Sequence, residues 1–380
     1  MSSHDRQREG ATLISANDQE PDTPRVWVLA GAHLGDTAQA VTLAQRLGWG
    51  FEVKKLSFNG LYRVPNVVSR SQLWNLTPEA REELRPPWPD LVIAVGRRSV
   101  PAALWIRRKA GGKTRLVHLG RPRAPLAWFD LVVTTPQYGL PRAPNVLHNL
   151  VPLTDDPAEV PTQTLNLWSE RLSSLPRPWI AVLIGGSRRP YRLDRTAISL
   201  LAQTASIRAR ALGGSLLVTT SPRTDPAHAA VLSNGVTAPA YIHIWDKDRE
   251  NPYKAFLALA DRFIVTGESV SMVTEACRSG KPTEIFPVPR DGWMKRRRDG
   301  RRPHGFKGLL MAHGLYSPDR DVEAFVNQLV ASGHAMRVGE RQPRNLKRLP
   351  DPMAETLRRV RALFAAEGAR KELGGNSPFV

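Results

Sequence analysis

The chain has 380 residues, of which 41% are hydrophobic and 23% charged, with 28 Gly and 32 Pro. This composition is typical of a loop-rich globular protein and excludes the disordered and fibrous classes, and the length suits two domains. Lys and Arg number 54 against 35 Asp and Glu, which gives a formal net charge of +19. Such a charge favours encounters with nucleotides, nucleic acid or anionic membranes, although an Arg-rich composition can also simply reflect the base composition of a genome.

The cysteine content and the first residues bear on the cellular compartment. Cys277 is the only cysteine, which excludes an internal disulfide and favours a reducing, cytoplasmic compartment. Its position in a helical stretch is more typical of a buried residue than of a catalytic thiol. Residues 1–24 are polar and lack the apolar run of a signal peptide, so we expect a disordered tail. The apolar runs are far shorter than the ~20 residues of a membrane helix.

The first predicted domain covers residues 25–160 and opens with a strand that runs into a glycine loop. The stretch "RVWVLAGAHLGD" contains that strand and a loop at Gly31 and Gly35, and "TAQAVTLAQRLG" predicts a helix that ends at Gly48. Strand-like runs then alternate with amphipathic helical stretches, the pattern of βα units around a buried parallel sheet. The Pro- and acid-rich "PLTDDPAEVPTQT" marks a linker, after which "PWIAVLIGGSRR" starts a new strand and glycine loop.

The second predicted domain, residues 175–345, repeats the organisation of the first. The stretches "PDLVIAVGRRSVPAALWIRRKAGGK" and "ADRFIVTGESVSMVTEACRSGKP" each place an Asp before a strand, a Gly after it, and a helix that ends in a basic glycine turn. Similar units in both halves predict an α/β protein of two Rossmann-like domains that face one another. Residues 350–370 carry apolar side chains at helical spacing, and we expect an amphipathic helix that packs back on a domain.

Three loops of the second domain contain groups suited to a phosphate. In doubly wound sheets, ligands bind beyond the carboxyl ends of the strands, where helix N-termini expose backbone N–H groups. The loops "GGSRRPYRLD", "TTSPRT" and "TGESVSMVTEAC" combine glycine, hydroxyl and arginine, although a glycine pair after a strand is also typical of a plain tight turn. The first half lacks GxGxxG, and no Walker loop is present. The residues expected at this donor site are Gly185, Gly186, Ser187, Arg188, Ser221, Arg223, Gly267, Ser269, Ser271 and Glu275.

Glu275 is a carboxylate among small and apolar residues of a predicted helix. Glu268 or Ser269 can cap this helix and leave the N–H groups near Ser271 free for an anion. Glu275 follows one turn beyond Ser271, roughly 6 Å along the helix axis. This is about the separation between a nucleotide's diphosphate and its ribose, so Glu275 is a candidate acceptor for the ribose hydroxyls. The alternative is a solvated carboxylate paired with a neighbouring basic residue.

Seven motifs in order carry a family resemblance. They are "WVLAGAHLGDTAQAVTLAQRLG", "PPWPDLVIAVGRRSVPAAL", "LVHLGRPRAPLAWFDLVVTTPQYGLP", "NVLHNL", "GGSRRPY", "TTSPRT" and "NPYKAFLALADRFIVTGESVSMVTEAC". Together they resemble the mitochondrial fission Elm family, whose bacterial members look like glycosyltransferases of the two-Rossmann GT-B class. The chain departs from the family pattern at His33, where many relatives have Lys or Arg, and at Glu268, where many have Asp.

The resemblance implies a nucleotide-sugar donor held mainly by the second domain and an acceptor held mainly by the first, without a cofactor. Glycosyl transfer needs a base for the acceptor hydroxyl and positive charge for the departing diphosphate. Candidates for the base are Asp36 and His33 in the first glycine loop, although Asp36 also suits a plain helix cap. Arginines after the first-domain strands suit an anionic acceptor, or they are ordinary surface charge. The residues expected at the acceptor site are Gly31, Gly35, Arg97, Arg98 and Arg121.

The expected function is therefore a metal-independent glycosyltransferase that moves a sugar to an anionic, lipid-linked acceptor, in the cytoplasm or peripherally on the inner face of a membrane. The alternative is a non-catalytic GT-B-like interaction protein at a membrane surface. The basic run "RDGWMKRRRDGRR", residues 290–302, is expected to be an exposed loop that either docks on anionic lipid or covers the donor site. Nucleic-acid binding is disfavoured because no recognisable module accompanies the basic charge. The sugar, the nucleotide, the acceptor, the stereochemistry and the oligomeric state stay open.

Overall fold

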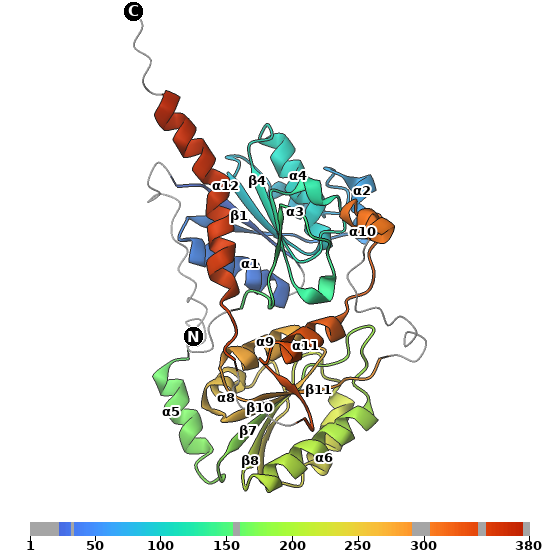
Figure 1. The fold of residues 1–380 in the computed structure, drawn as a ribbon, viewed down its shortest axis with the longest axis vertical. Coiled ribbons are helices and arrows are strands. Elements are labelled where there is room, and N and C mark those ends of the chain that lie inside the picture. The colour runs from blue at the N-terminus through green and yellow to red at the C-terminus, as the bar shows by residue number, and fades with distance from the viewer. Residues whose placement is uncertain (1–22, 32–33, 155–159, 291–304, 341–346, 375–380) are drawn as a thin grey trace, which may run out of the picture. The chain divides into compact units, whose positions relative to one another are not determined.

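The computed structural model describes residues 23–31, 34–154, 160–290, 305–340 and 347–374. The chain divides into two compact units, Met1–Leu131 with Val360–Val380, and Val132–Arg359. Two six-stranded sheets with flanking helices form the frame, and the strand pairs with a defined register run parallel (Figure 1). This confirms the prediction of an α/β protein with two Rossmann-like halves.

The first sheet has the strand order β2-β1-β3-β4-β5-β6. Its central strands β1 and β3 are buried along their whole length, which explains why their sequences are almost continuously apolar. The strands are β1 (Val26–Ala30), β2 (Phe51–Lys55), β3 (Leu91–Val95), β4 (Arg115–Leu119), β5 (Leu131–Thr134) and β6 (Val146–His148). The α-helices between them are α1 (Leu34–Leu47), α2 (Asn66–Ser69), α3 (Pro78–Glu82) and α4 (Val100–Lys109).

The second sheet has the order β9-β8-β7-β10-β11-β12, the 3-2-1-4-5-6 order of a Rossmann fold. The chain reverses direction across the sheet between β7 and β10, so the topological switch point lies there. The strands are β7 (Trp179–Leu183), β8 (Ser215–Thr219), β9 (Ala240–His243), β10 (Arg262–Thr266), β11 (Thr283–Phe286) and β12 (Met336–Arg337). The helices are α5 (Thr162–Arg171), α6 (Arg195–Ala211), α7 (Ala229–Gly235), α8 (Tyr253–Leu259), α9 (Val270–Arg278), α10 (Gly305–Ala312) and α11 (Val322–Ala331).

The Asp that precedes a strand in both halves has the same structural role in each. Asp90 Oδ2 accepts a hydrogen bond from the backbone N–H of Arg25 at 2.9 Å, just before β1. Asp261 Oδ2 accepts one from the backbone N–H of Trp179 at 2.7 Å, at the start of β7. In each sheet the carboxylate therefore ties the strand that follows it to its central neighbour. The repeat in the sequence reflects this shared requirement.

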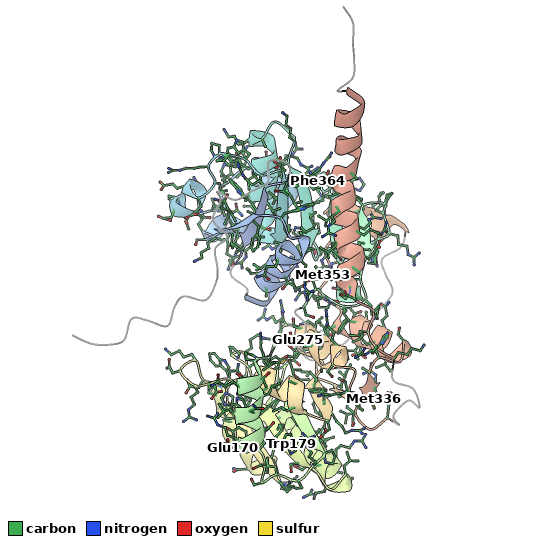
Figure 2. All side chains as sticks on the ribbon, turned by 90° about the vertical axis from the view of Figure 1, so that its left-hand side faces the viewer. Glu170, Trp179, Glu275, Met336, Met353 and Phe364 are labelled. Carbon is green, nitrogen blue, oxygen red and sulfur yellow. The ribbon has the colours of Figure 1, made fainter. Side chains whose placement is uncertain are left out.

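The last described helix is α12 (Pro352–Gly374), along which Met353 and Phe364 lie (Figure 2). Met353 and Val360 are buried, and the ring of Phe364 meets that of Trp49 edge-on at 5.3 Å. The apolar spacing seen in the sequence thus corresponds to side chains in contact with the protein. Within the described ranges, no helix combines the length and the apolar character that crossing a bilayer requires.

Candidate functional site

The predicted donor residues gather at the carboxyl end of the second sheet. Three loops meet there: residues 184–194 after β7, residues 220–225 after β8, and residues 267–269 between β10 and α9. The first and third of these loops flank the topological switch point between β7 and β10, where open α/β sheets bind their ligands. Figure 2 shows Glu275 of α9 at the end of this unit opposite to Trp179, the first residue of β7.

The two loops at the switch point are bonded to each other through backbone N–H groups. Gly186 N–H donates to Glu268 Oε1 at 2.7 Å, and Gly185 N–H donates to Thr266 Oγ1 at 2.9 Å. A Cβ at Gly185 would overlap Glu268 Oε1, and one at Gly186, where φ is +149°, would overlap the backbone carbonyl of Arg223. The glycine pair therefore lets the loops pack against each other.

The loop after β8 is held in the same cluster. Ser221 Oγ and Thr224 Oγ1 both donate to the carbonyl of Gly185, the latter at 2.7 Å. Arg223 Nη2 donates to Ser269 Oγ at 3.3 Å. Burial lowers the pKa of Arg223, the charge of Glu268 raises it, and the charge of Arg188 lowers it. Arg188 and Arg223 therefore lie within electrostatic range of one another at this loop cluster.

Glu268 is the residue at this site that the sequence did not single out as a ligand. Its side chain is only 3% exposed, and within the described part of the chain Oε2 has no hydrogen-bond partner. Burial raises the pKa of this carboxyl, while the N–H of Gly186 and the charge of Arg223 lower it. Buried polar atoms in proteins are normally hydrogen-bonded, so a buried carboxyl oxygen without a partner is unusual and indicates a position for a ligand or water. In the sequence, Glu268 was considered only as a cap for the helix that follows it.

Helix α9 begins at this cluster without a side-chain cap. Ser269 occupies the N-cap position, but its side chain makes no capping hydrogen bond. Glu268 points back to the loop after β7 and does not cap the helix. The expectation that one of these residues caps α9 is therefore wrong. Ser271 lies in the first turn of α9, where backbone N–H groups have no partner within the helix.

Glu275 lies one turn further along α9 and accepts a hydrogen bond from a tyrosine. The phenol of Tyr253 donates to Glu275 Oε2 at 2.5 Å. Burial and the negative charge of Glu275 raise the pKa of Tyr253 well above its ordinary value. Arg278 donates instead to the carbonyl of Thr154, and Lys281 to that of Ala258. The hydrogen bond from Tyr253 thus orients the carboxylate of Glu275.

Two further donor candidates serve the local fold. Ser187 Oγ accepts from the backbone N–H of Leu193 at 3.0 Å and closes the loop after β7. A Cβ at Gly267 would lie 3.2 Å from the carbonyl of Phe286, so glycine lets this loop pack on β11. Beside the loop cluster, a cavity of about 150 Å³ is lined by residues of the loop after β8 together with side chains such as Ile198, Ile244 and Trp245.

The candidates of the first half belong to separate loops. His33 lies outside the described residues, and Gly35 and Asp36 lie in the first turn of α1, so Asp36 is not the residue before the helix. Gly31 directly follows β1, and a Cβ added there would meet no atom within 4 Å. The three arginines of the predicted acceptor site follow β3 and β4: Arg97 and Arg98 are half-buried, and Arg121 is buried.

The basic run, the single cysteine and the expectation of metal independence were also raised by the sequence. Residues 291–304, which contain nearly all of the predicted basic loop, lie outside the described residues. The thiol of Cys277 is buried, and burial raises its pKa to about 12, so it has the character of a core residue. Among the described residues, no cluster of His, Cys, Asp and Glu has the form of a metal site.

Comparison with known proteins gives relatives along most of the chain. A protein from Arabidopsis thaliana named mitochondrial fission protein ELM1 is 27% identical over 236 residues, which cover 56% of this chain and 55% of that protein. The match thus spans about half the length of this relative. An uncharacterized protein from Rickettsia prowazekii is 23% identical over 304 residues, which cover 71% of this chain and 85% of that protein.

Solved structures resemble the chain at lower sequence identity. A glycosyltransferase from Rickettsia africae matches 94% of this chain and all of its own, with 11% identity and a TM-score of 0.47. A UDP-GlcNAc 2-epimerase from Methanocaldococcus jannaschii matches 89% of this chain and 99% of its own, with 9% identity and a TM-score of 0.47. The family model described as mitochondrial fission ELM1 matches residues 34–319. The chain therefore belongs to the mitochondrial fission ELM1 family.

Proposed function

We propose that the protein is a glycosyltransferase that binds the diphosphate of a nucleotide-sugar at the carboxyl end of its second sheet. The observation that carries this proposal is the meeting of three loops at the β7/β10 switch point, with Arg223, the uncapped N-terminus of α9 and the half-satisfied Glu268 in one cluster. Each element alone is common in α/β proteins. Their meeting at one switch point is typical of a phosphate site.

Positive charge is the main contribution of this cluster to the reaction. In the transfer, the acceptor oxygen bonds to the anomeric carbon, the bond from that carbon to the diphosphate oxygen breaks, and the acceptor proton passes to a base. The departing diphosphate gains negative charge, which fixed donors stabilise best. Arg223, Arg188 and the N–H groups of α9 supply such donors. A hydrogen bond to a charged group contributes about 1.5–3 kcal/mol, more than the roughly 0.3–1 kcal/mol of a helix dipole.

Glu268 complements this charge when its carboxyl is neutral. Burial favours the neutral carboxyl. Oε1 accepts from Gly186 N–H, whereas Oε2 has no partner among the described residues, so a proton on this carboxyl would be held by Oε2. A protonated Oε2 donates a hydrogen bond to an anion, whereas an ionised one repels it. In its neutral form Glu268 would both tie the two loops together and offer a donor to a bound phosphate.

The nucleoside would extend from the diphosphate along α9 and toward the neighbouring cavity. Glu275 lies about 6 Å beyond Ser271 along the helix, and Tyr253 holds its carboxylate in place. A fixed carboxylate suits the two hydroxyls of a ribose. The cavity of about 150 Å³ beside Ile244 and Trp245 adjoins the loop after β8 and would hold the nucleobase.

The acceptor side rests on the family resemblance and on the arginines after β3 and β4. We place an anionic acceptor near Arg97, Arg98 and Arg121, and assign the role of base to Asp36 or His33. A variant at each candidate base that retains donor binding but loses transfer would identify which of the two acts.

A titration tests the donor site. The wild type should bind nucleoside diphosphates and their sugar conjugates more tightly than the matching nucleosides. Arg223→Ala should weaken diphosphate binding by roughly 10- to 100-fold, because a charged hydrogen bond is lost. Arg210→Ala is the matched control, since Arg210 bonds Thr237 near the opposite end of α6. If no nucleotide binds, the site is not a donor site, and the non-catalytic alternative becomes the better account.

A further inference from the structure

Residues 58–76 form a closed loop on the first sheet, here called the 58–76 loop. An antiparallel bridge between Phe58 and Leu76 closes its ends. Inside, Asn66 Nδ2 donates to the carbonyls of Arg97 and Pro122, each at 2.8 Å, and so joins the loops that follow β3 and β4. The loop is thus fixed to its unit by buried polar side chains. Its helix α2 lies beside α4 at the margin of that unit (Figure 1).

Three large apolar side chains of the 58–76 loop are exposed to solvent instead. Leu61 is 51% exposed, Val68 60% and Trp74 50%, whereas the neighbouring Asn66 is 4% exposed and Asn75 is equally buried. This is the reverse of the order that folding in water favours. Three large apolar residues exposed on one short loop are typical of a surface that another apolar phase covers.

Several arginines lie in this loop or directly beside it. Arg98 stacks on the ring of Tyr62 at 3.8 Å, and Arg63 and Arg97 lie about 6 Å from the same ring. Burial, followed by the charges of Arg123 and Arg98, lowers the pKa of Arg97. Among the described residues, no ion pair joins any of these four arginines to an acid. We call Arg63, Arg97, Arg98 and Arg123 the arginine cluster.

We propose that the 58–76 loop and the arginine cluster together form a docking surface for an anionic lipid bilayer. The loop sequence "FNGLYRVPNVVSRSQLWNL" contains no Asp or Glu, so nothing in it opposes a negative surface. Arginines interact with the headgroups while Leu61, Val68 and Trp74 enter the interface, where Trp is favoured. A soluble anion would use the arginine cluster but leaves the exposed apolar side chains unexplained.

This surface is separate from the proposed donor site and lies on the first sheet, where it shares Arg97 and Arg98 with the proposed acceptor site. If the protein does not bind vesicles, the nucleotide titration still tests the donor site. If it does not bind nucleotides, vesicle binding still tests the docking surface. Its residues are also other than those of the basic run 290–302, which was expected either to dock on anionic lipid or to cover the donor site. Substitutions in the 58–76 loop therefore distinguish the two.

Co-sedimentation of the full chain with vesicles tests the proposal. At physiological ionic strength the protein should bind vesicles of phosphatidylcholine with phosphatidylglycerol, and not phosphatidylcholine alone. The triple variant Leu61→Ser, Val68→Ser, Trp74→Ser should lower the partition coefficient at least about tenfold. Arg63→Ser with Arg98→Ser should lower it by roughly 25-fold, about fivefold for each arginine. The control Leu200→Ser with Ile207→Ser removes two apolar side chains of α6 that are more than half exposed, and should change nothing.

A fluorescent probe locates the contact independently of these losses. The native Cys277 is buried, so an environment-sensitive dye on Val68→Cys reports on the loop alone, and one on Ile207→Cys is its control. Emission of the Val68 probe should rise and shift to shorter wavelength with anionic vesicles, while the control stays constant. An unresponsive Val68 probe, or equal vesicle binding by the wild type and the triple variant, would overturn the proposal. The proposal would also be overturned by a combination of two results. Inorganic pyrophosphate would bind tightly through the arginine cluster, and the triple variant would still bind vesicles as well as the wild type.

Discussion

Acidification should destabilise the first sheet through one buried histidine. His118 lies in β4 with no exposed surface, its ring 5.3 Å from that of Phe129. Neither ring nitrogen has a hydrogen-bond partner within the described structure. Burial lowers its pKa from 6.5 to about 3, because a charged imidazole cannot be solvated there.

The sign and size of the effect follow from these two pKa values. The unfolded chain binds a proton at His118 below pH 6.5, whereas the folded protein does so only near pH 3. Stability is therefore fully present above pH 6.5 and is lost as the pH falls from there toward 3, by about 1.4 kcal/mol per pH unit. Between pH 8 and pH 5, His118 alone should lower the free energy of unfolding by about 2 kcal/mol.

Urea unfolding at pH 8, 6 and 5 measures this loss. Hydrogen exchange of peptides from β3 and β4 reads the first sheet separately from the second. The variant His118→Leu removes the titrating group and keeps a similar volume, and His118→Met separates the effect of packing from that of charge. Between pH 8 and pH 5, the free energy of unfolding of both variants should fall by about 2 kcal/mol less than that of the wild type. Equal pH dependence in the wild type and both variants would show that His118 is not held neutral by the fold.

Four further predictions concern the second sheet. Gly186→Ala should destabilise the fold by about 1–3 kcal/mol in urea unfolding because its Cβ overlaps backbone, whereas Gly31→Ala, with open space around it, should be nearly neutral; comparable losses would contradict the packing argument. Glu275→Gln should weaken nucleotide binding about tenfold or more without changing the unfolding midpoint, and unchanged affinity would remove its ribose role. Arg188→Ala should lower affinity for a nucleoside diphosphate more than for the nucleoside; equal losses would contradict its placement at the phosphates. Cys277 should react with a thiol reagent only after unfolding, since burial raises its pKa to about 12; rapid labelling of the native protein would contradict this.

The fold could be predicted because its signals are local. Apolar runs such as "VWVLA" and "LVIAV" became fully buried strands, since a parallel sheet covered on both faces leaves no polar positions. Asp90 and Asp261 precede equivalent strands, β3 and β10. Each carboxylate accepts a hydrogen bond from a backbone N–H at the start of the neighbouring strand, β1 or β7. The strand order itself depends on long-range pairing, and no periodicity in the sequence encodes it.

The site was harder to predict because its residues act across loops. A glycine pair has the same appearance whether it admits a ligand or a neighbouring loop, and only the overlap with Glu268 and Arg223 decides between these. Glu268 seemed a helix cap from its position, but its carboxylate bonds a residue 82 positions away. The exposure of Leu61 and Val68 was likewise invisible, because polar anchors such as Asn66 reverse the usual pattern of burial.

A nucleoside diphosphate should bind at the switch point of the second sheet. Hydrogen exchange of the full chain with and without saturating nucleoside diphosphate, read peptide by peptide, tests it most directly. Protection is expected in residues 184–194, 220–225 and 266–275, the segments that meet through Gly186, Arg223 and Glu268. Arg223→Ala should abolish this protection at the same ligand concentration. Protection confined to peptides of the first sheet, or no protection under conditions where binding is measured, would contradict it.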